Sequence, residues 1–181
     1  MYSNVNTNLI LLFAAFPGQV KDFYKSYDYK DELAWAAAWI YRAENSAAAK
    51  AEAEKLYVDY GIQWTGNEFN WDSKKPGTIA LMAEITGDSK YYTALAQYVE
   101  KVMRIKKTPK GLVFVQKWAP NRHAANVAFI AAQAAALKPA LPKAGEYFRF
   151  AQKQLNYLLG DTGRSFVVGF GRNPPKEPHH R

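Results

Sequence analysis

The chain has 181 residues, of which 49% are hydrophobic and 15% aromatic, so it is long and apolar enough for one folded domain. A formal charge of +8 would suit a nucleic-acid partner, but the basic residues are scattered along the sequence, with small clusters only at Lys106, Lys107 and Lys110 and in the tail. No nucleic-acid-binding motif accompanies them, and we expect no such partner. There is no cysteine, which excludes disulfides and thiolate metal sites.

The N-terminal region contains one apolar run, Leu9–Phe16. This run is shorter than the roughly 20 residues that a membrane-spanning helix needs, so we expect no membrane span. A secretory signal would also have a basic start, which is absent, and a small-x-small cleavage site, which is not clear. We interpret the run as a first buried helix or an irregular start.

The hydrophobic pattern predicts six helices after this region. Their expected ranges are Lys30–Ala43, Ser46–Tyr60, Thr78–Thr86, Ser89–Arg104, Arg122–Leu137 and Lys143–Leu159. Between the fourth and fifth helices, residues 108–116 alternate in polarity, which indicates a short strand or extended segment. Gly160 is expected to end the last helix.

These helices are paired by short turns, and a long loop follows every second helix. Helical hairpins packed side by side form either an open solenoid or a closed α/α toroid. No strict repeat of 34 or 40 residues is visible, and the loops are richer in aromatic residues than a solenoid usually needs. The pattern therefore favours an all-α toroid.

The last stretch, 160–181, has no helical period and combines four glycines, three prolines, two histidines and three arginines. Such a composition is typical of a shaped loop. Its end, His179, His180 and Arg181, could bind a polyol or an anion, or could be exposed to solvent without a function.

Aromatic residues gather at helix ends and in connections. A flat aromatic face can contact the C–H side of a sugar ring, or it can pack beneath a loop, and the sequence leaves both roles open. The residues concerned are Tyr24, Tyr27, Tyr29, Trp64, Phe69, Trp71 and Trp118.

Two acidic residues, Asp31 and Glu32, fall in the first turn of the first predicted helix, where carboxylates suit the helix dipole. With Asp72 they could instead bind a hard cation such as calcium, which prefers several oxygen ligands. The adjacent pair cannot chelate alone. No nucleophile elbow, P-loop, dinucleotide fingerprint or zinc-helix motif occurs in the sequence.

Five segments, YKDELAWAAAWIYRA, FNWDSK, TPKGLVF, KWAPNRHAANVAF and LGDTGRSFVVGFGRNPPKEPHHR, follow one another in the order and spacing of glycoside hydrolase family 9. The chain resembles the invertebrate endoglucanases of that family. The resemblance divides it into a divergent segment, 1–22, and a partial catalytic domain, 23–181. It implies an (α/α)6 toroid, about half of it present, whose loops at one end form a cleft for β-1,4-glucan, cleaved with inversion.

The resemblance also implies roles for single residues. Histidine and arginine of PHHR line the family's cleft beside the scissile sugar, which corresponds to His179 and Arg181. Trp118 and Arg122 correspond to residues that contact glucosyl units, and Tyr24 to a further cleft tyrosine. A structural calcium ion held by Asp31, Glu32 and Asp72 is implied as the cofactor, with cellulose or cello-oligosaccharides as the partner and secretion as the localisation.

The two carboxylates that perform the reaction in this family are absent from the sequence. In the family the base belongs to an Asp-Ala-Gly-Asp motif near the N-terminus, and the acid to the Glu of an Asn-Glu-x-x-x-x-Tyr-Asn-Ala segment near the C-terminus; neither motif occurs here. We expect the chain to be a central fragment of an endoglucanase, inactive by itself. The alternatives are a noncatalytic glucan-binding module and a helical interaction module.

Overall fold

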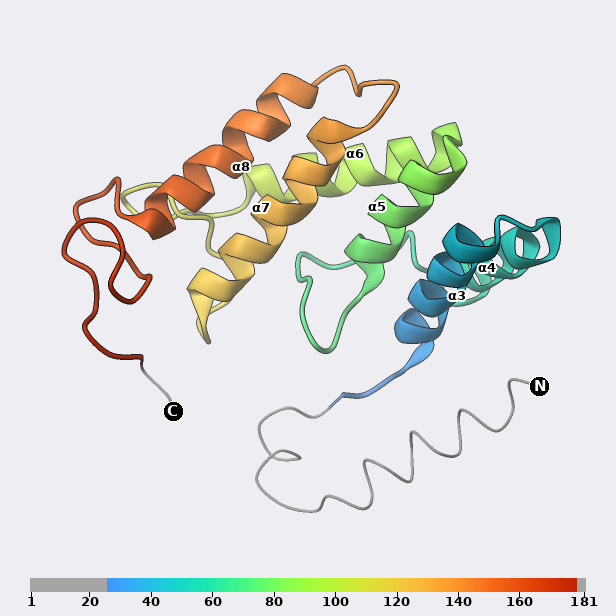
Figure 1. Cartoon of the computed structure of the whole chain (residues 1–181), viewed down its shortest axis with the longest axis horizontal. Coiled ribbons are helices and arrows are strands. Elements are labelled where there is room, and N and C mark those ends of the chain that lie inside the picture. The colour runs from blue at the N-terminus through green and yellow to red at the C-terminus, as the bar shows by residue number, and fades with distance from the viewer. Residues whose placement is uncertain (1–25, 179–181) are drawn as a thin grey trace, which may run out of the picture.

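The computed structural model of the chain describes residues 26–178, and this part is built of α-helices (Figure 1). Its helices are α3 (Lys30–Glu44), α4 (Ala47–Asp59), α5 (Lys75–Thr86), α6 (Ser89–Arg104), α7 (Pro120–Ala136) and α8 (Ala144–Leu159). None of the described helices is both long and apolar enough to cross a bilayer.

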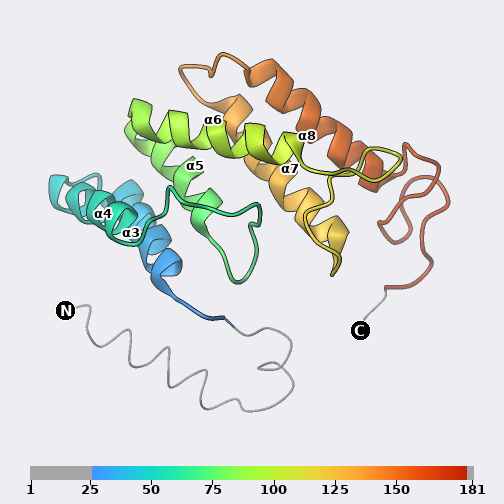
Figure 2. The same cartoon turned by 180° about the vertical axis from the view of Figure 1, so that it is seen from behind.

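The helices form three hairpins, α3–α4, α5–α6 and α7–α8, that lie side by side along an arc (Figures 1 and 2). Helices α3, α5 and α7 contact one another in succession, so they form the inner row, and α4, α6 and α8 each pack against the inner helix of their own hairpin. This two-row arrangement confirms the predicted all-α architecture of paired helices, with three hairpins in the described residues.

Burial explains why each helix lies in its row. In α5, eight consecutive residues from Pro76 to Ala83 are buried, because this helix is surrounded by α3, α6 and α7. Helix α6 instead buries a single stripe, Tyr91, Leu95, Tyr98, Val99 and Val102, and leaves its other side to solvent. The central helix α5 thus needs an apolar surface all round, whereas the outer helix α6 is amphipathic.

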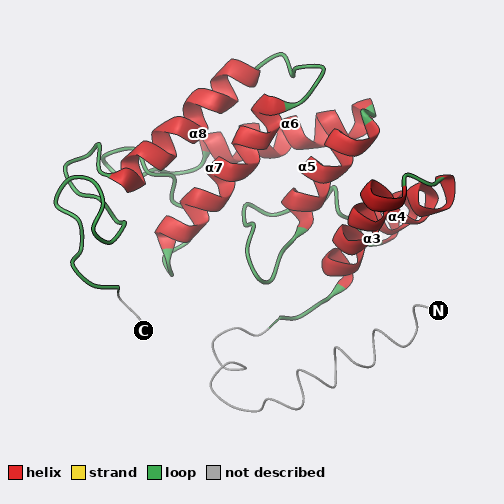
Figure 3. Ribbon diagram, in the orientation of Figure 1, coloured by secondary structure: helices red, strands yellow, loops and turns green. Residues whose placement is uncertain are grey.

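The long loops lie where the inner helices begin, which we call the long-loop end of the arc, and the short turns lie at the opposite ends of these helices (Figure 3). The predicted helices are confirmed with shifts at their starts. Helices α5 and α7 begin earlier than expected, at Lys75 and Pro120, because proline suits the first helical turn, where its missing N–H is not needed. The predicted strand is reduced to one bridge, Lys107 to Val113.

Gly160 ends α8 with φ +117°, as expected, and the loop after it is folded on itself. Ser165 N–H donates to the Arg172 carbonyl at 2.7 Å, and Gly169 N–H donates to the Pro175 carbonyl at 3.2 Å. The prediction of a shaped loop is therefore confirmed for residues 160–178. Tyr24, His179, His180 and Arg181 lie outside the described residues.

Candidate functional site

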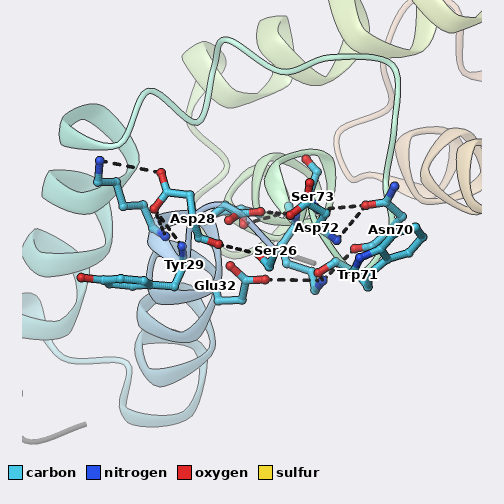
Figure 4. Close-up of polar contacts among 12 residues, drawn as sticks. Ser26, Asp28, Tyr29, Glu32, Asn70, Trp71, Asp72 and Ser73 are labelled. Atoms are coloured by element: carbon cyan, nitrogen blue, oxygen red, sulfur yellow. Dashed lines mark hydrogen bonds and ion pairs between the residues drawn. The ribbon is translucent and has the colours of Figure 1, made fainter. Parts of the chain in front are cut away.

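The loop between α4 and α5 brings two polar clusters to the long-loop end of the arc. Its segment 70–74 lies against the start of α3 and the residues before it (Figure 4). The same segment contributes Trp71 to a contact with α7. One loop therefore connects the residues predicted to bind a cation with those predicted to bind a sugar.

Asp31 is 5% exposed, and its Oδ2 accepts a hydrogen bond from the backbone N–H of Lys74, directly before α5. Its own helix begins after Tyr29, and just before it Asp28 Oδ1 accepts from the N–H groups of Tyr29 at 2.8 Å and Lys30 at 3.1 Å. Asp31 thus tethers the start of α5 to α3, a role that its position in the sequence does not reveal.

Glu32 lies beside Asp31, whose carboxyl group disfavours the ionisation of Glu32. Burial, followed by the hydrogen bond and charge of Asp31, raises the pKa of Glu32 to about 7, although the Lys74 ammonium acts in the opposite direction. Glu32 Oε1 is 3.7 Å from Lys74 Nζ, and its Oε2 is buried without a hydrogen-bond partner among the described residues. The pair therefore has one carboxylate oxygen available for a further cation.

Asp72 is not in the same cluster of oxygens. Its Oδ1 accepts from Tyr27 N–H at 3.3 Å, and its own N–H donates to Asn70 Oδ1 at 2.9 Å (Figure 4). Between 26 and 178 no three His, Asp or Glu side chains are grouped closely enough to hold a metal ion. The structure thus brings Asp31 and Glu32 together and leaves Asp72 across the turn.

Lys74 is the residue of this cluster that the sequence analysis missed. Its ammonium donates to the carbonyl oxygens of Asn70 and Trp71, both at 2.7 Å, besides facing Glu32. It closes the 70–74 segment into a turn from within. Its place two residues after Asp72 in the FNWDSK segment was the available signal.

The second cluster lies at the start of α7. The Arg122 guanidinium carbon is 4.5 Å from the centroid of the Trp71 ring, and Arg122 Nη2 is 2.9 Å from Nε2 of the buried His123. One turn further, Asn126 Nδ2 donates to the Phe69 carbonyl at 2.6 Å. These contacts hold the loop of Trp71 against α7.

Two tryptophans of the long loops present their rings to solvent: Trp118 is 69% exposed and Trp64 is 80% exposed. Trp118 precedes α7 and is followed by Ala119, whose φ of +49° turns the chain into the helix. Phe69 differs from them, because its ring packs against Gly77 of α5. The aromatic loop residues therefore divide into exposed faces and loop supports.

Comparison with known proteins identifies relatives with one activity. The profile of glycosyl hydrolase family 9 matches residues 8–181, a range that extends into the segment predicted as divergent. Endoglucanase B of Cellulomonas fimi is 36% identical over 177 residues, covering 88% of this chain and 17% of the relative. The chain thus spans less than a fifth of that protein.

Two solved structures have the same fold. An endoglucanase from the termite Nasutitermes takasagoensis superposes with a TM-score of 0.83 at 42% identity, covering 99% of this chain and 44% of the other. The endoglucanase CelQ from Clostridium thermocellum, complexed with cellotriose, superposes with a TM-score of 0.78 at 31% identity, covering 91% and 30%. The three hairpins therefore correspond to part of a larger catalytic domain.

Proposed function

Because this chain belongs to glycosyl hydrolase family 9, we propose that it forms part of the glucan-binding cleft of an endo-β-1,4-glucanase that hydrolyses cellulose with inversion. The observation that carries the proposal is the Arg122–Trp71 stack at the long-loop end, close in sequence to the exposed Trp118. Relatives whose structures contain cello-oligosaccharides have the same fold.

The chemistry of these side chains suits a sugar chain. The exposed face of Trp118 offers an apolar surface to the C–H side of a glucosyl ring. Arg122 carries five N–H donors, and within residues 26–178 only His123 forms a hydrogen bond with it. Of the others, the Nε–H is buried without a partner in the described region, so we assign the remaining Nη donors to sugar hydroxyls. We assign glucan contacts to these two residues, and extend the assignment to Tyr24, His179 and Arg181 from the family resemblance alone.

Hydrolysis needs more than this surface. An inverting glycosidase uses one carboxylate to activate water and one carboxylic acid to protonate the leaving oxygen, about 6.5–9.5 Å apart. Asp31 accepts from the Lys74 backbone N–H, Glu32 Oε1 faces the Lys74 ammonium, and Asp72 accepts from the Tyr27 N–H. The family's two catalytic motifs do not occur in the sequence. The 181-residue chain therefore binds glucan without cleaving it.

The test is the release of reducing ends from carboxymethylcellulose by the purified chain, with an intact family 9 endoglucanase as the positive control. We expect no release above that of buffer. Release by the chain at even about a hundredth of the control's rate would contradict the assignment, because removing a catalytic group lowers rates by at least about a hundredfold.

A structural calcium ion is the second part of the proposal, with Asp31, Glu32 and Asp72 as its ligands. The buried, partnerless Oε2 of Glu32 supports it, since calcium takes carboxylate oxygens as ligands. The support is confined to the Asp31–Glu32 pair, because Asp72 contacts Tyr27 instead. A rise in melting temperature with millimolar Ca²⁺ that is absent in Glu32→Gln is expected, whereas the same rise in both proteins would refute it.

The alternative of a noncatalytic glucan-binding module shares the observations on Trp118 and Arg122. It differs only in whether flanking coding sequence supplies the two catalytic motifs. Coding sequence on either side that contains the two missing motifs would favour the enzyme, and a natural transcript ending at Arg181 would favour the module. We propose secretion in either case, because the substrate is an extracellular polymer.

A further inference from the structure

We propose that His123 is a positioning residue for glucan binding: its buried imidazole accepts a hydrogen bond from Arg122 and holds the guanidinium over Trp71. The inference deepens the proposed function and rests on it, since Arg122 matters here as a sugar contact. His123 itself is 0% exposed and reaches no ligand.

The contact between Arg122 and His123 is not a consequence of helix geometry. Adjacent residues on an α-helix point in directions about 100° apart, so their side chains do not face each other. Arg122 nevertheless brings Nη2 to 2.9 Å from His123 Nε2, while its guanidinium carbon stays 4.5 Å from the Trp71 centroid. The arginine is therefore fixed by two contacts, a ring on one side and an acceptor at one end.

The protonation state of His123 follows from its partner. A guanidinium has only donors, so Nε2 must carry the lone pair, and the neutral ring has its proton on Nδ1. A charged imidazolium would place two donors and two positive charges against each other. Burial, followed by the Arg122 charge, lowers the pKa of His123, while the Glu68 carboxylate opposes this effect. The imidazole ring is thus neutral, and accepts at Nε2, at neutral pH.

Packing alone does not explain a histidine at this position. The other buried residues of α7 are apolar: Ala124, Val127, Ala128, Ile130, Ala131 and Ala134. An apolar side chain of similar size would fill the same space, whereas burying an imidazole costs free energy unless a hydrogen bond compensates. The Nδ1 atom has no partner among residues 26–178, so Arg122 is the compensating contact. The position therefore requires an acceptor at Nε2.

The loop of Trp71 is fixed independently of His123. Asn126 donates to the Phe69 carbonyl, and Lys74 donates to the Trp71 carbonyl. Removing the imidazole acceptor is expected to free the guanidinium and leave the ring in place. This separates a positioning role, which affects Arg122, from a folding role, which would affect the whole loop.

Binding of cellotetraose to the full 181-residue chain by isothermal titration calorimetry tests the inference. Three variants are compared: His123→Gln, whose amide oxygen can reach the Nε2 position; His123→Asn, whose shorter amide cannot; and His123→Leu, which has no acceptor. We expect Gln to keep Kd within about threefold, and Asn and Leu to raise it roughly tenfold or more. In combination with Arg122→Ala, His123→Leu should cause no further loss.

Each outcome distinguishes the two proposals. If the unmodified chain does not bind cellotetraose, the proposed function fails and the positioning role fails with it. If it binds and both Asn and Leu bind equally well, only the positioning role is overturned. Far-UV circular dichroism verifies folding, and should Leu not fold, the Gln–Asn pair decides. Imidazole ¹⁵N NMR is expected to show His123 neutral with the proton on Nδ1; protonated Nε2 would contradict the inference whether or not glucan binds.

Discussion

The tether between Asp31 and the start of α5 is the contact whose loss we expect to be most costly at the site. Asp31→Ala removes the acceptor of the Lys74 N–H in a position where Asp31 is 5% exposed, so water does not readily replace it. An unsatisfied buried donor costs about 1–3 kcal/mol. For a domain of this size, each kcal/mol lowers the melting temperature by about 2–4 °C, which gives a loss of about 2–12 °C.

Asp31→Asn is the matched comparison. It keeps an oxygen acceptor for Lys74 and removes the charge that opposes ionisation of Glu32. Thermal unfolding followed by circular dichroism should therefore show Asn close to the unmodified chain and Ala well below it. Asp161→Ala, which removes an exposed carboxylate that forms no side-chain hydrogen bond or ion pair in the described region, should change stability by less than about 0.5 kcal/mol. Equal melting temperatures for Ala and Asn would refute the tether.

Three further predictions concern other parts of the chain. The pKa of Glu32 is raised from 4.5 to about 7, so its contribution to the stability of the metal-free protein should be greatest below pH 4.5 and fall by about 1–3 kcal/mol as the pH rises to 7. In urea titrations, Glu32→Gln should abolish this pH dependence of the free energy of unfolding. An unchanged pH dependence in the variant would contradict the burial of Glu32. Gly171 has φ +80°, and Gly171→Ala would push a Cβ into the Leu159 carbonyl oxygen, so trypsin should cut loop 160–178 faster in this variant. Gly169→Ala should have the smaller effect, because a Cβ at that position would meet no neighbouring atom. Equal cleavage of the two variants would argue against the close approach of Gly171 to Leu159. Helix α8 exposes an apolar stripe, formed by Phe148, Leu155 and Leu159, so the chain should self-associate, which light scattering would detect. The double variant Phe148→Ser, Leu155→Ser should associate less, and the control Lys153→Ser should not. A monomer at all concentrations would refute the expectation.

The helices could be predicted from the sequence because their signals are local. Apolar periodicity, Gly87 and Gly160 at helix ends, and Asp88 as an N-cap each act within a few residues of the helix they define. The starts of α5 and α7 were predicted too late in the sequence; each of these helices has a proline in its first turn, where the missing N–H is not needed. The two-row arrangement followed from the paired pattern of long and short connections.

The site was less predictable because its contacts join distant segments. Nothing near Asp31 in the sequence indicates that it accepts from Lys74, 43 residues away, or that Trp71 lies against Arg122. The prediction of a three-carboxylate cation site requires the Asp72 carboxylate to approach those of Asp31 and Glu32. In the described structure, Asp72 Oδ1 instead accepts a hydrogen bond from the Tyr27 N–H. The Lys74 ammonium, which donates to the carbonyl oxygens of Asn70 and Trp71, has no local signal in the sequence that indicates this role beyond its place two residues after Asp72.

Binding of cello-oligosaccharides tests the central claim most directly. Calorimetric titration of the chain with cellotetraose, and with maltotetraose as the α-linked control, should show saturable binding of the β-linked sugar alone. Arg122→Ala and Trp118→Ala should each weaken it roughly tenfold, since each removes a proposed sugar contact, while Trp39→Ala on α3 should not. Absence of binding to cellotetraose, or equal binding to both sugars, would contradict the assignment of this arc of hairpins as part of a β-1,4-glucan cleft.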